Sequence, residues 1–219
     1  MRSERAAARE SKHFGPPLPR SFYDRDPRFV ARAVLGKVLV RRWRGKLLAG
    51  RIVEVEAYLG VGDLAAHASA GVTSRNRVLF GPPGHAYVYF IYGAYYCLNF
   101  SCMAEGDAGC VLVRALEPLT GLELMARNRG IELPPDPTTR QSRALASGPG
   151  RLCDALGITR ERDNGKDLTT SASDLFVFDD GYVRVKVATT IRIGITKDEH
   201  HRLRYVIAGN PFVSRSEKS

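Results

Sequence analysis

The pattern of apolar and polar positions predicts strands along most of the chain, with a few short helices between them. Asp26, Pro27 and Gly36 are typical of an N-cap, a first helical position and a C-terminal stop, and an apolar helical face lies between them. Residues 37–42 and 47–58 are rich in Val, Leu and Ile and flank a glycine-containing turn. This pattern predicts a helix followed by a β-hairpin.

The second strand of this hairpin alternates strictly, which predicts two different faces. Ile52, Glu54 and Glu56 form one face, and the residues of the other are Val53, Val55 and Ala57. Two carboxylates at this spacing lie about 6.5–7 Å apart. If they face a pocket, they can activate water or stabilise a cationic transition state, whereas on a solvated face they are ordinary surface charges.

The remaining chain shows the same preference for strands. Residues 59–85 are rich in Gly and Pro and predict an irregular segment, and residues 131–146 predict a polar loop. Helices are predicted over 118–129 and 149–156. Further strands are predicted over 109–116, 175–178, 182–195 and 203–208.

Residues 86–104 form an uncharged segment with five tyrosines. Aromatic and β-branched residues around a central glycine predict two strands and a turn rather than a membrane span. Tyr92 falls at the expected tip, where an exposed ring can stack on nucleic-acid bases or wedge between them. An aromatic protein–protein contact or a cross-strand core explains this segment equally well at this level.

These elements predict a mixed α/β (α+β) fold: a single compact domain around a curved, largely antiparallel sheet with a protruding Tyr-rich β-hairpin. Residues 20–219 are expected to form this domain. Residues 1–19 are expected to form a flexible basic tail, because they are polar and end in a proline-rich run. Since the tail shows no apolar signal-peptide region, we expect a cytoplasmic protein.

The charge of the chain indicates a polyanionic partner. Its 219 residues include 33 lysines and arginines against 23 aspartates and glutamates, so the net charge is +10 and the pI is near 9.7. Clustered cations bind phosphates by releasing counterions, which favours a nucleic-acid partner. A surface whose charge serves only solubility is the alternative. The ordinary composition excludes collagen-like, disulfide-stapled and wholly disordered chains.

The cysteines and histidines carry no sign of metal or thiol chemistry. A site built from Glu54, Glu56 and His67 lacks the spacing of common metal motifs, and no nucleophile motif is present. The cysteines form no CxxC pair and lie in apolar or mixed segments, so we expect buried, reduced side chains. They are Cys97, Cys102, Cys110 and Cys153. We expect neither a metal ion nor an organic cofactor.

Several motifs occur in a fixed order from about Phe22 to Ser214. They include a Glu-Ala-Tyr block ending at Tyr58 and a Tyr-x-x-Tyr-Gly block ending at Gly93. The segments are residues 51–60, 63, 67, 75–76, 87–95, 99, 111–118 and 147–152. In these motifs the chain resembles the alkyladenine (3-methyladenine) DNA glycosylase family.

The resemblance implies a pocket for a damaged purine that is flipped out of the duplex. By matching position, Tyr58 and His67 form one wall and Tyr89 the other, and the backbone of Ala65 and His67 reads the purine edge. Asn99 crowds the exocyclic amine of guanine. The implied base-binding residues are Tyr58, Ala65, His67, Tyr89, Asn99 and Leu112.

The resemblance also implies catalytic and DNA-contacting residues. Glu56 deprotonates or orients the water that attacks C1′, and Arg114 and the Ile193 carbonyl help to hold that water. The implied intercalating residues are Tyr92, Ala94 and Tyr95. Contacts to the DNA backbone or to the water are implied for Thr73, Arg75, Gly150, Arg151 and Ile193.

The implied activity is that of a monofunctional DNA glycosylase. Such an enzyme hydrolyses the N-glycosidic bond of alkylated or deaminated purines in double-stranded DNA during base excision repair, here in the nucleoid. A silent DNA-binding module with the same wedge is one alternative, and a hydrolase of small nucleosides is another. The catalytic residues argue against the first alternative, and the wedge and the positive charge argue against the second.

Overall fold

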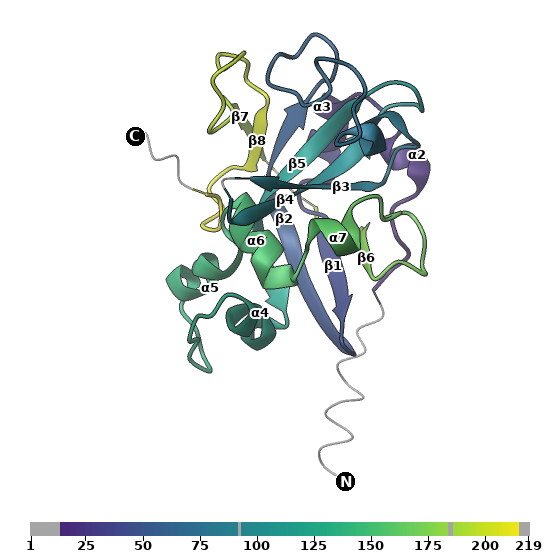
Figure 1. The fold of residues 1–219 in the computed structure, drawn as a ribbon. Coiled ribbons are helices and arrows are strands. Elements are labelled where there is room, and N and C mark those ends of the chain that lie inside the picture. The colour runs from purple at the N-terminus through teal and green to yellow at the C-terminus, as the bar shows by residue number, and fades with distance from the viewer. Residues whose placement is uncertain (1–13, 92, 184–185, 215–219) are drawn as a thin grey trace.

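A curled antiparallel sheet dominates the computed structural model, which describes residues 14–91, 93–183 and 186–214 (Figure 1). Its strands are β1 (Val38–Trp43), β2 (Lys46–Tyr58), β3 (Ala86–Ile91), β4 (Tyr95–Cys102), β5 (Gly109–Thr120), β6 (Leu175–Phe178), β7 (Val187–Thr190) and β8 (Arg204–Ile207). Their order is β3-β4-β5-β2-β1-β6, while β8 pairs with β2 and β7 with β8. The predicted mixed α/β class and the largely antiparallel sheet are confirmed.

Strand β2 is the centre of the sheet and positions the glutamates. It pairs with β5 along one edge, and two strands share its other edge. β1 pairs with residues 46–51, and β8 pairs with Glu54, Val55 and Glu56. Glu54 and Glu56 are fully buried rather than part of a solvated face, because their carboxylates are covered by side chains and backbone groups from other segments.

The alternation along β2 is broken, so one part of the two-face prediction is wrong. The pairing with β5 is irregular between Ile52 and Glu54. Such a bulge inserts an extra residue and changes which way the preceding side chains point. Ile52 therefore packs in the same core cluster as Val53, Val55 and Ala57 instead of sharing a face with the glutamates.

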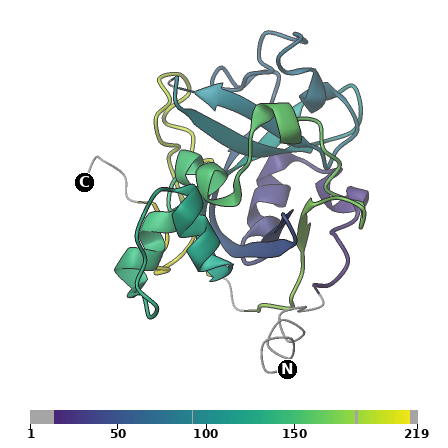
Figure 2. The same ribbon diagram turned by 60° about the horizontal axis from the view of Figure 1, so that its bottom comes forward.

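Short helices surround the sheet. They are α2 (Arg20–Tyr23), α3 (Pro27–Val34), α4 (Leu122–Asn128), α5 (Thr139–Ala146), α6 (Pro149–Leu156) and α7 (Arg160–Asp163), with a 3-10 turn η1 (Arg77–Phe80). α3 and α6 lie where the sequence predicts helices, and the Asp26 side chain caps α3 by accepting the Arg28 amide. α4, α5 and α6 gather into one group beside the sheet (Figure 2), and α6 packs on β4 and β5.

Three predicted boundaries are wrong. β5 continues to Thr120, and the helix predicted from residue 118 begins only after Gly121, which has a left-handed φ of 79°. The predicted polar loop contains α5, because Thr138 and Gln141 form a capping box that starts a helix in a polar sequence. Of the strand predicted over 182–195, the described residues form only β7.

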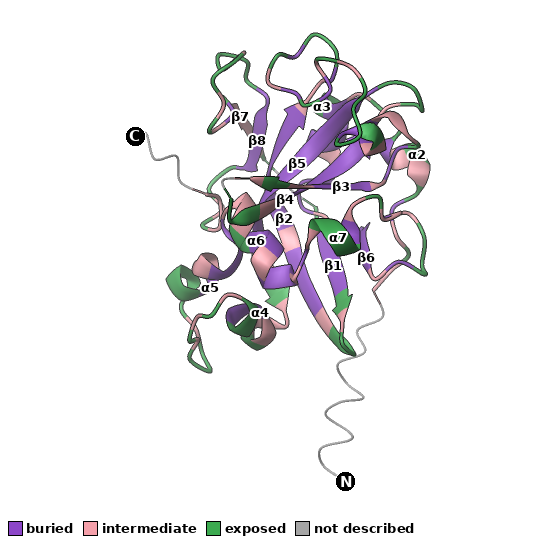
Figure 3. Cartoon of the chain, in the orientation of Figure 1, coloured by how far each residue is buried: buried purple, intermediate pink, exposed green. Residues whose placement is uncertain are grey.

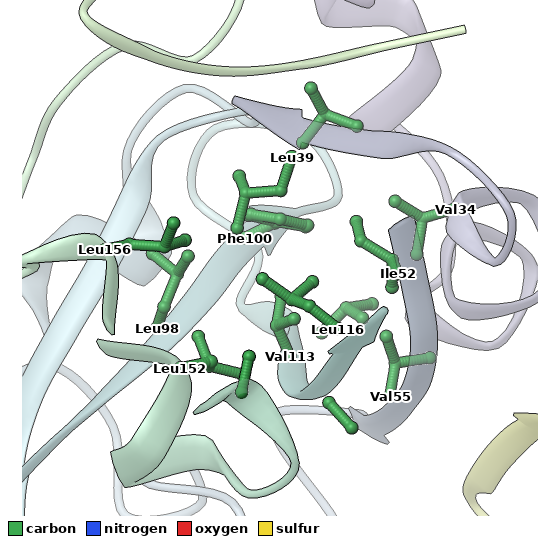
Figure 4. Packing of buried hydrophobic residues seen from close by; sticks show 14 of the residues in the cluster. Val34, Leu39, Ile52, Val55, Leu98, Phe100, Val113, Leu116, Leu152 and Leu156 are labelled. Atoms are coloured by element: carbon green, nitrogen blue, oxygen red, sulfur yellow. The ribbon is translucent and has the colours of Figure 1, made fainter. Parts of the chain in front are cut away.

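The main core lies between the sheet and the helices. Figure 4 shows Val34 of α3, Leu152 and Leu156 of α6 and strand residues such as Leu98 and Val113 meeting in one cluster. The strands are buried along most of their length, whereas the helices expose their outer faces (Figure 3). All four cysteines are buried and free.

Part of the predicted tail is packed onto the domain. The Phe14 ring meets the Phe178 ring edge-on at a centroid distance of 5.0 Å, and the Leu18 amide donates to the Val177 carbonyl at 2.8 Å. Phe14 and Leu18, which the sequence placed in the tail, therefore contact β6. Residues 1–13 lie outside the described part of the chain. No helix among the described residues is long and apolar enough to cross a membrane.

Candidate active site

A cavity of about 660 Å³ opens beside the ends of β2 and β5. It collects most of the predicted site residues from widely separated parts of the sequence. Those that line it are Tyr58, Ala65, His67, Tyr89, Tyr95, Asn99, Leu112, Arg114, Gly150, Arg151 and Ile193. Such a concave site with several aromatic rings and a few convergent polar groups is typical of a ligand-binding pocket.

Glu56 lies directly behind the surface of this cavity. The Tyr58 hydroxyl donates to its Oε2 atom at 3.0 Å, and the Ile193 amide donates to its Oε1 atom at 2.8 Å. The Arg114 Nη1 atom lies 3.3 Å from the same Oε1 atom. All three partners line the cavity, so the carboxylate is held by the groups that face the pocket. The contact of Ile193 is made by its amide, whereas the sequence assigned a role to its carbonyl.

Burial gives the Glu56 carboxyl the character of a base. Burial raises its pKa, and the Arg114 charge, the Ile193 amide and the Tyr58 hydroxyl oppose this effect without cancelling it. Burial and the neighbouring Glu56 charge also raise the pKa of Tyr58, so its hydroxyl stays protonated and donates. A buried carboxylate with a raised pKa accepts protons more readily than an exposed one, which suits a general base.

Glu54 is the structural neighbour of Glu56. Its Oε1 atom accepts from the Arg114 Nε atom at 3.0 Å and from the Arg204 Nε atom at 2.8 Å, and Ser214 donates from its amide and its hydroxyl. These contacts place three donors on Oε1 and the Ser214 amide on Oε2. Glu54 does not line the cavity, and it orients Arg114 toward Glu56.

One wall of the cavity is a cluster of three aromatic rings. Tyr87 and Tyr89 lie two residues apart on β3, and the His67 ring packs edge-on against Tyr89 with a centroid distance of 4.5 Å. The His67 Nδ1 atom lies 3.0 Å from the Tyr87 hydroxyl. The resemblance implied that His67 shares a wall with Tyr58; in the structure its ring contacts Tyr87 and Tyr89 of β3.

Tyr58, at the end of β2, is a separate part of the lining. The guanidinium of Arg192 covers its ring at 4.7 Å from the centroid. Arg192 in turn pairs with Asp63 through two hydrogen bonds of 2.6 and 2.9 Å. Tyr58 is thus supported from behind by a cation, while the residue also borders the cavity.

The loop between Tyr58 and β3 is held by the buried side chain of Asn76. Its Nδ2 atom donates to the carbonyls of His67 and Gly71 at 2.9 Å, and its Oδ1 atom accepts the Thr73 amide. Thr73 and Arg75 are exposed and do not line the cavity, although the Arg75 guanidinium lies 5.6 Å from the Tyr89 ring centroid. Their predicted DNA contacts stay a prediction.

Asn99 has a fixed amide orientation at the floor of the cavity. Its Nδ2 atom donates to the Tyr87 carbonyl at 3.1 Å, and its Oδ1 atom accepts from the Cys110 thiol at 3.7 Å. Burial raises the pKa of Cys110 to about 12, so the thiol keeps its proton. The second N–H of the Asn99 amide has no protein partner among the described residues.

The start of α6 packs closely against the tyrosine-rich strands. A Cβ atom at Gly150 would lie 2.9 Å from the Cβ and ring atoms of Tyr95 at the start of β4. β3 and β4 pair along their length, and Tyr92, the predicted wedge, lies outside the described residues. Ala94 and Tyr95 next to it are exposed. Gly150 therefore fixes how this end of β4 sits on α6.

Gly150→Ala is expected to destabilise the protein by about 1–3 kcal/mol, because the added methyl group collides with the Tyr95 ring. Urea unfolding measures this difference. Gly81→Ala is the matched control, since a Cβ atom there meets only one carbonyl oxygen at 3.7 Å. Equal stability of the two variants would show that the Gly150–Tyr95 contact is not tight.

Sequence reasoning missed several groups at the site. The two-residue spacing places Tyr87 on the same face as Tyr89, but the sequence assigned Tyr87 no role, and Arg192 carried no local signal. Cys97, Cys110 and Arg129 also line the cavity. Within residues 14–91, 93–183 and 186–214, no group of three His, Cys, Asp or Glu side chains gathers as a metal site.

Comparisons with known proteins identify the family of this chain. The model of the methylpurine-DNA glycosylase family matches residues 21–211. A protein of Koribacter versatilis is 60% identical, covering 90% of this chain and 93% of its own. Relatives from Alkaliphilus oremlandii and Methanocella arvoryzae are 44% and 46% identical, covering 90% and 91% of this chain and 98% and 96% of their own. All three are provisionally named 3-methyladenine DNA glycosylases.

The chain therefore belongs to the methylpurine-DNA glycosylase family, and its enzyme class is that of a DNA glycosylase, a hydrolase of DNA repair. This result confirms the family resemblance of the sequence. It also excludes the nucleoside-hydrolase alternative at the level of the family.

Proposed function

We propose that this enzyme flips alkylated or deaminated purines out of duplex DNA into the cavity and hydrolyses their N-glycosidic bond. The observation that carries the proposal is the Glu56 carboxylate. It is fully buried, has a raised pKa and is held by three groups that line the pocket. A hydrolysis at C1′ needs such a base to activate or orient one water molecule.

The hydrogen bonds of Glu56 leave it free for this role. The Oε1 atom faces the Ile193 amide and Arg114, while Oε2 accepts only the Tyr58 hydroxyl among the described residues. A carboxylate oxygen has two lone pairs, so Oε2 keeps one for a water molecule. Arg114 stabilises the ionised form, and its remaining donors can orient the same water.

The flipped purine would stack between Tyr58 and the His67–Tyr89 cluster. Aromatic faces bind any purine, whereas the Ala65 backbone and the Asn99 amide would read its edge. Positively charged purines such as 3-methyladenine are good leaving groups and need little acid catalysis. Neutral purines such as hypoxanthine need protonation of a ring nitrogen as well.

The exposed start of β4 and the start of α6 would contact the DNA. Tyr92, with Ala94 and Tyr95, would enter the minor groove and fill the space of the flipped nucleotide. Arg151 and the amides at the start of α6 would bind a phosphate. The phosphate contacts would hold the enzyme on any duplex, and the wedge would favour flipping.

Base release from alkylated duplex DNA tests the proposal. The purified protein is expected to release free 3-methyladenine and to leave an intact strand with an abasic site. Free methylated nucleosides, the control, are expected to stay intact. Borohydride is expected to trap no covalent adduct, because the described cavity lining contains no lysine to form a Schiff base. Hydrolysed nucleosides, or a trapped adduct, would contradict the proposal.

Asn99→Ser is expected to raise the excision of undamaged guanine on the order of tenfold, because a smaller side chain no longer crowds its exocyclic amine. Competition between guanine and hypoxanthine in otherwise identical duplexes measures the change. If the excision of both bases is unchanged, Asn99 only packs against Tyr87 and Cys110.

A further inference from the structure

A fully buried ion pair lies behind the cavity wall. The Arg192 guanidinium donates to both carboxylate oxygens of Asp63, at 2.6 and 2.9 Å. The side chains are 0% and 1% exposed. Burial alone would raise the pKa of Asp63, but the hydrogen bonds from Arg192 and from two backbone amides outweigh it and lower the pKa, so the carboxyl is ionised at neutral pH.

This pair connects three segments that build the site. Asp63 accepts the amides of Leu59 and Ala65 at 3.0 and 3.1 Å. Arg192 donates to the Ala57 carbonyl at 3.2 Å, and its neighbour Ile193 donates to Glu56. The pair therefore joins the end of β2, the loop before His67 and the segment after β7.

The pair also sets the charge behind Tyr58. Arg192 stacks on the Tyr58 ring. Among the described residues, Asp63 is the only carboxylate within hydrogen-bond distance of Arg192. Three carboxylates and three guanidinium groups form ion pairs around the end of β2. They are Glu54, Glu56 and Asp63 against Arg114, Arg192 and Arg204. Loss of the Asp63 charge would leave one uncompensated cation behind the pocket.

We propose that Asp63 is a specificity-determining residue: by holding and neutralising Arg192 behind Tyr58, it allows the cavity to accept purines that carry a positive charge. This inference rests on the proposed function, because it assumes that the flipped base stacks on Tyr58. It adds a residue role to that function, since the pair discriminates between purines by charge and not by shape.

The distances make the effect strong. The guanidinium lies 4.7 Å from the Tyr58 centroid. A base stacked on the opposite face adds about 3.5 Å, so the two charges lie about 8 Å apart. At this separation, in a buried site from which salt is excluded, the repulsion is hardly screened. A neutral purine experiences no such repulsion.

The test compares one cationic and one neutral lesion in the same protein. Single-turnover base release is measured for 7-methylguanine and for hypoxanthine in otherwise identical duplexes, with wild type and Asp63→Asn. The rate for 7-methylguanine divided by the rate for hypoxanthine is expected to fall at least tenfold in Asp63→Asn, whether or not the individual rates also change. An unchanged ratio would overturn the proposal.

Two further variants separate charge from structure. Asp163→Asn is the matched control, because Asp163 is equally buried and pairs with Arg41 at 2.7 Å outside the cavity. Its ratio is expected to match wild type. Arg192→Met in the Asp63→Asn background removes the uncompensated cation and is expected to restore the ratio. A reduced ratio in the control, or no recovery in the double variant, would contradict the inference.

The outcome does not depend on the folding of one variant. If Asp63→Asn does not fold, Arg192→Met alone is measured. Its ratio is expected to stay at or above the wild-type ratio, and a tenfold fall would contradict the inference. If the wild type releases neither base, the proposed function itself fails. If it releases both and the ratio ignores these substitutions, only the role of Asp63 fails.

Discussion

Glu56→Gln is expected to reduce base release by about 10²–10⁴-fold, because the amide cannot accept the proton of the attacking water. The substitution keeps the size of the side chain and its contact with the Ile193 amide. Binding to lesion-containing duplex is expected to stay within a few fold of wild type. Single-turnover kinetics and a binding titration on the same duplex measure the two quantities separately.

Glu54→Gln is the matched comparison for this result. Glu54 is equally buried and lies two residues away, but its carboxylate is occupied by Arg114, Arg204 and Ser214. We expect a lower free energy of unfolding and a smaller loss of rate than in Glu56→Gln. An inactive Glu54→Gln together with an active Glu56→Gln would reverse the assigned roles.

Arg114→Met is expected to have the second largest effect. Removal of its charge leaves Glu54 and Glu56 buried with one partner fewer, and breaking a buried pair costs about 3–5 kcal/mol of stability. Arg114 also opposes the rise in the pKa of Glu56, so its loss raises that pKa further. Because the ionised carboxylate is the active form, the acidic limb of the pH–rate profile moves to higher pH.

Arg204→Met is the control for this shift. Arg204 contacts Glu54 at 2.8 Å with an exposure close to that of Arg114, yet it forms no ion pair with Glu56. We expect Arg204→Met to lose about as much stability as Arg114→Met, while the acidic limb of its pH–rate profile stays where it is in the wild type. If both variants move the limb equally, the effect reflects general loosening of the site and not the Arg114 charge.

The local pattern of the sequence was sufficient for the strand that carries the glutamates. β2, its hairpin partner β1 and the helices α3 and α6 lie close to their predicted positions, since caps, turns and apolar residues agree there. α5 was missed because its start depends on a side-chain capping box in a polar segment. The bulge at Ile52 depends on pairing with β5, which the sequence of β2 does not contain.

The groups that hold the site were harder to predict than those that line it. Asp63 and Arg192 are separated by 129 positions, and Glu54 and Arg204 by 150, so their pairing exists only after folding. The contacts of His67 with Tyr87 and Tyr89 could not be predicted, because a loop side chain takes its direction from packing. The residue types therefore predicted which side chains could act at the site, whereas the folded sheet determines how these side chains are placed relative to one another.

The most direct test of the proposed reaction is the crystal structure of Glu56→Gln bound to duplex DNA that contains one hypoxanthine. The base is expected to lie in the cavity between Tyr58 and the His67–Tyr89 cluster, with C1′ next to the side chain at position 56. A hypoxanthine that remains stacked in the duplex, or one that binds with its sugar away from position 56, would contradict the proposed reaction.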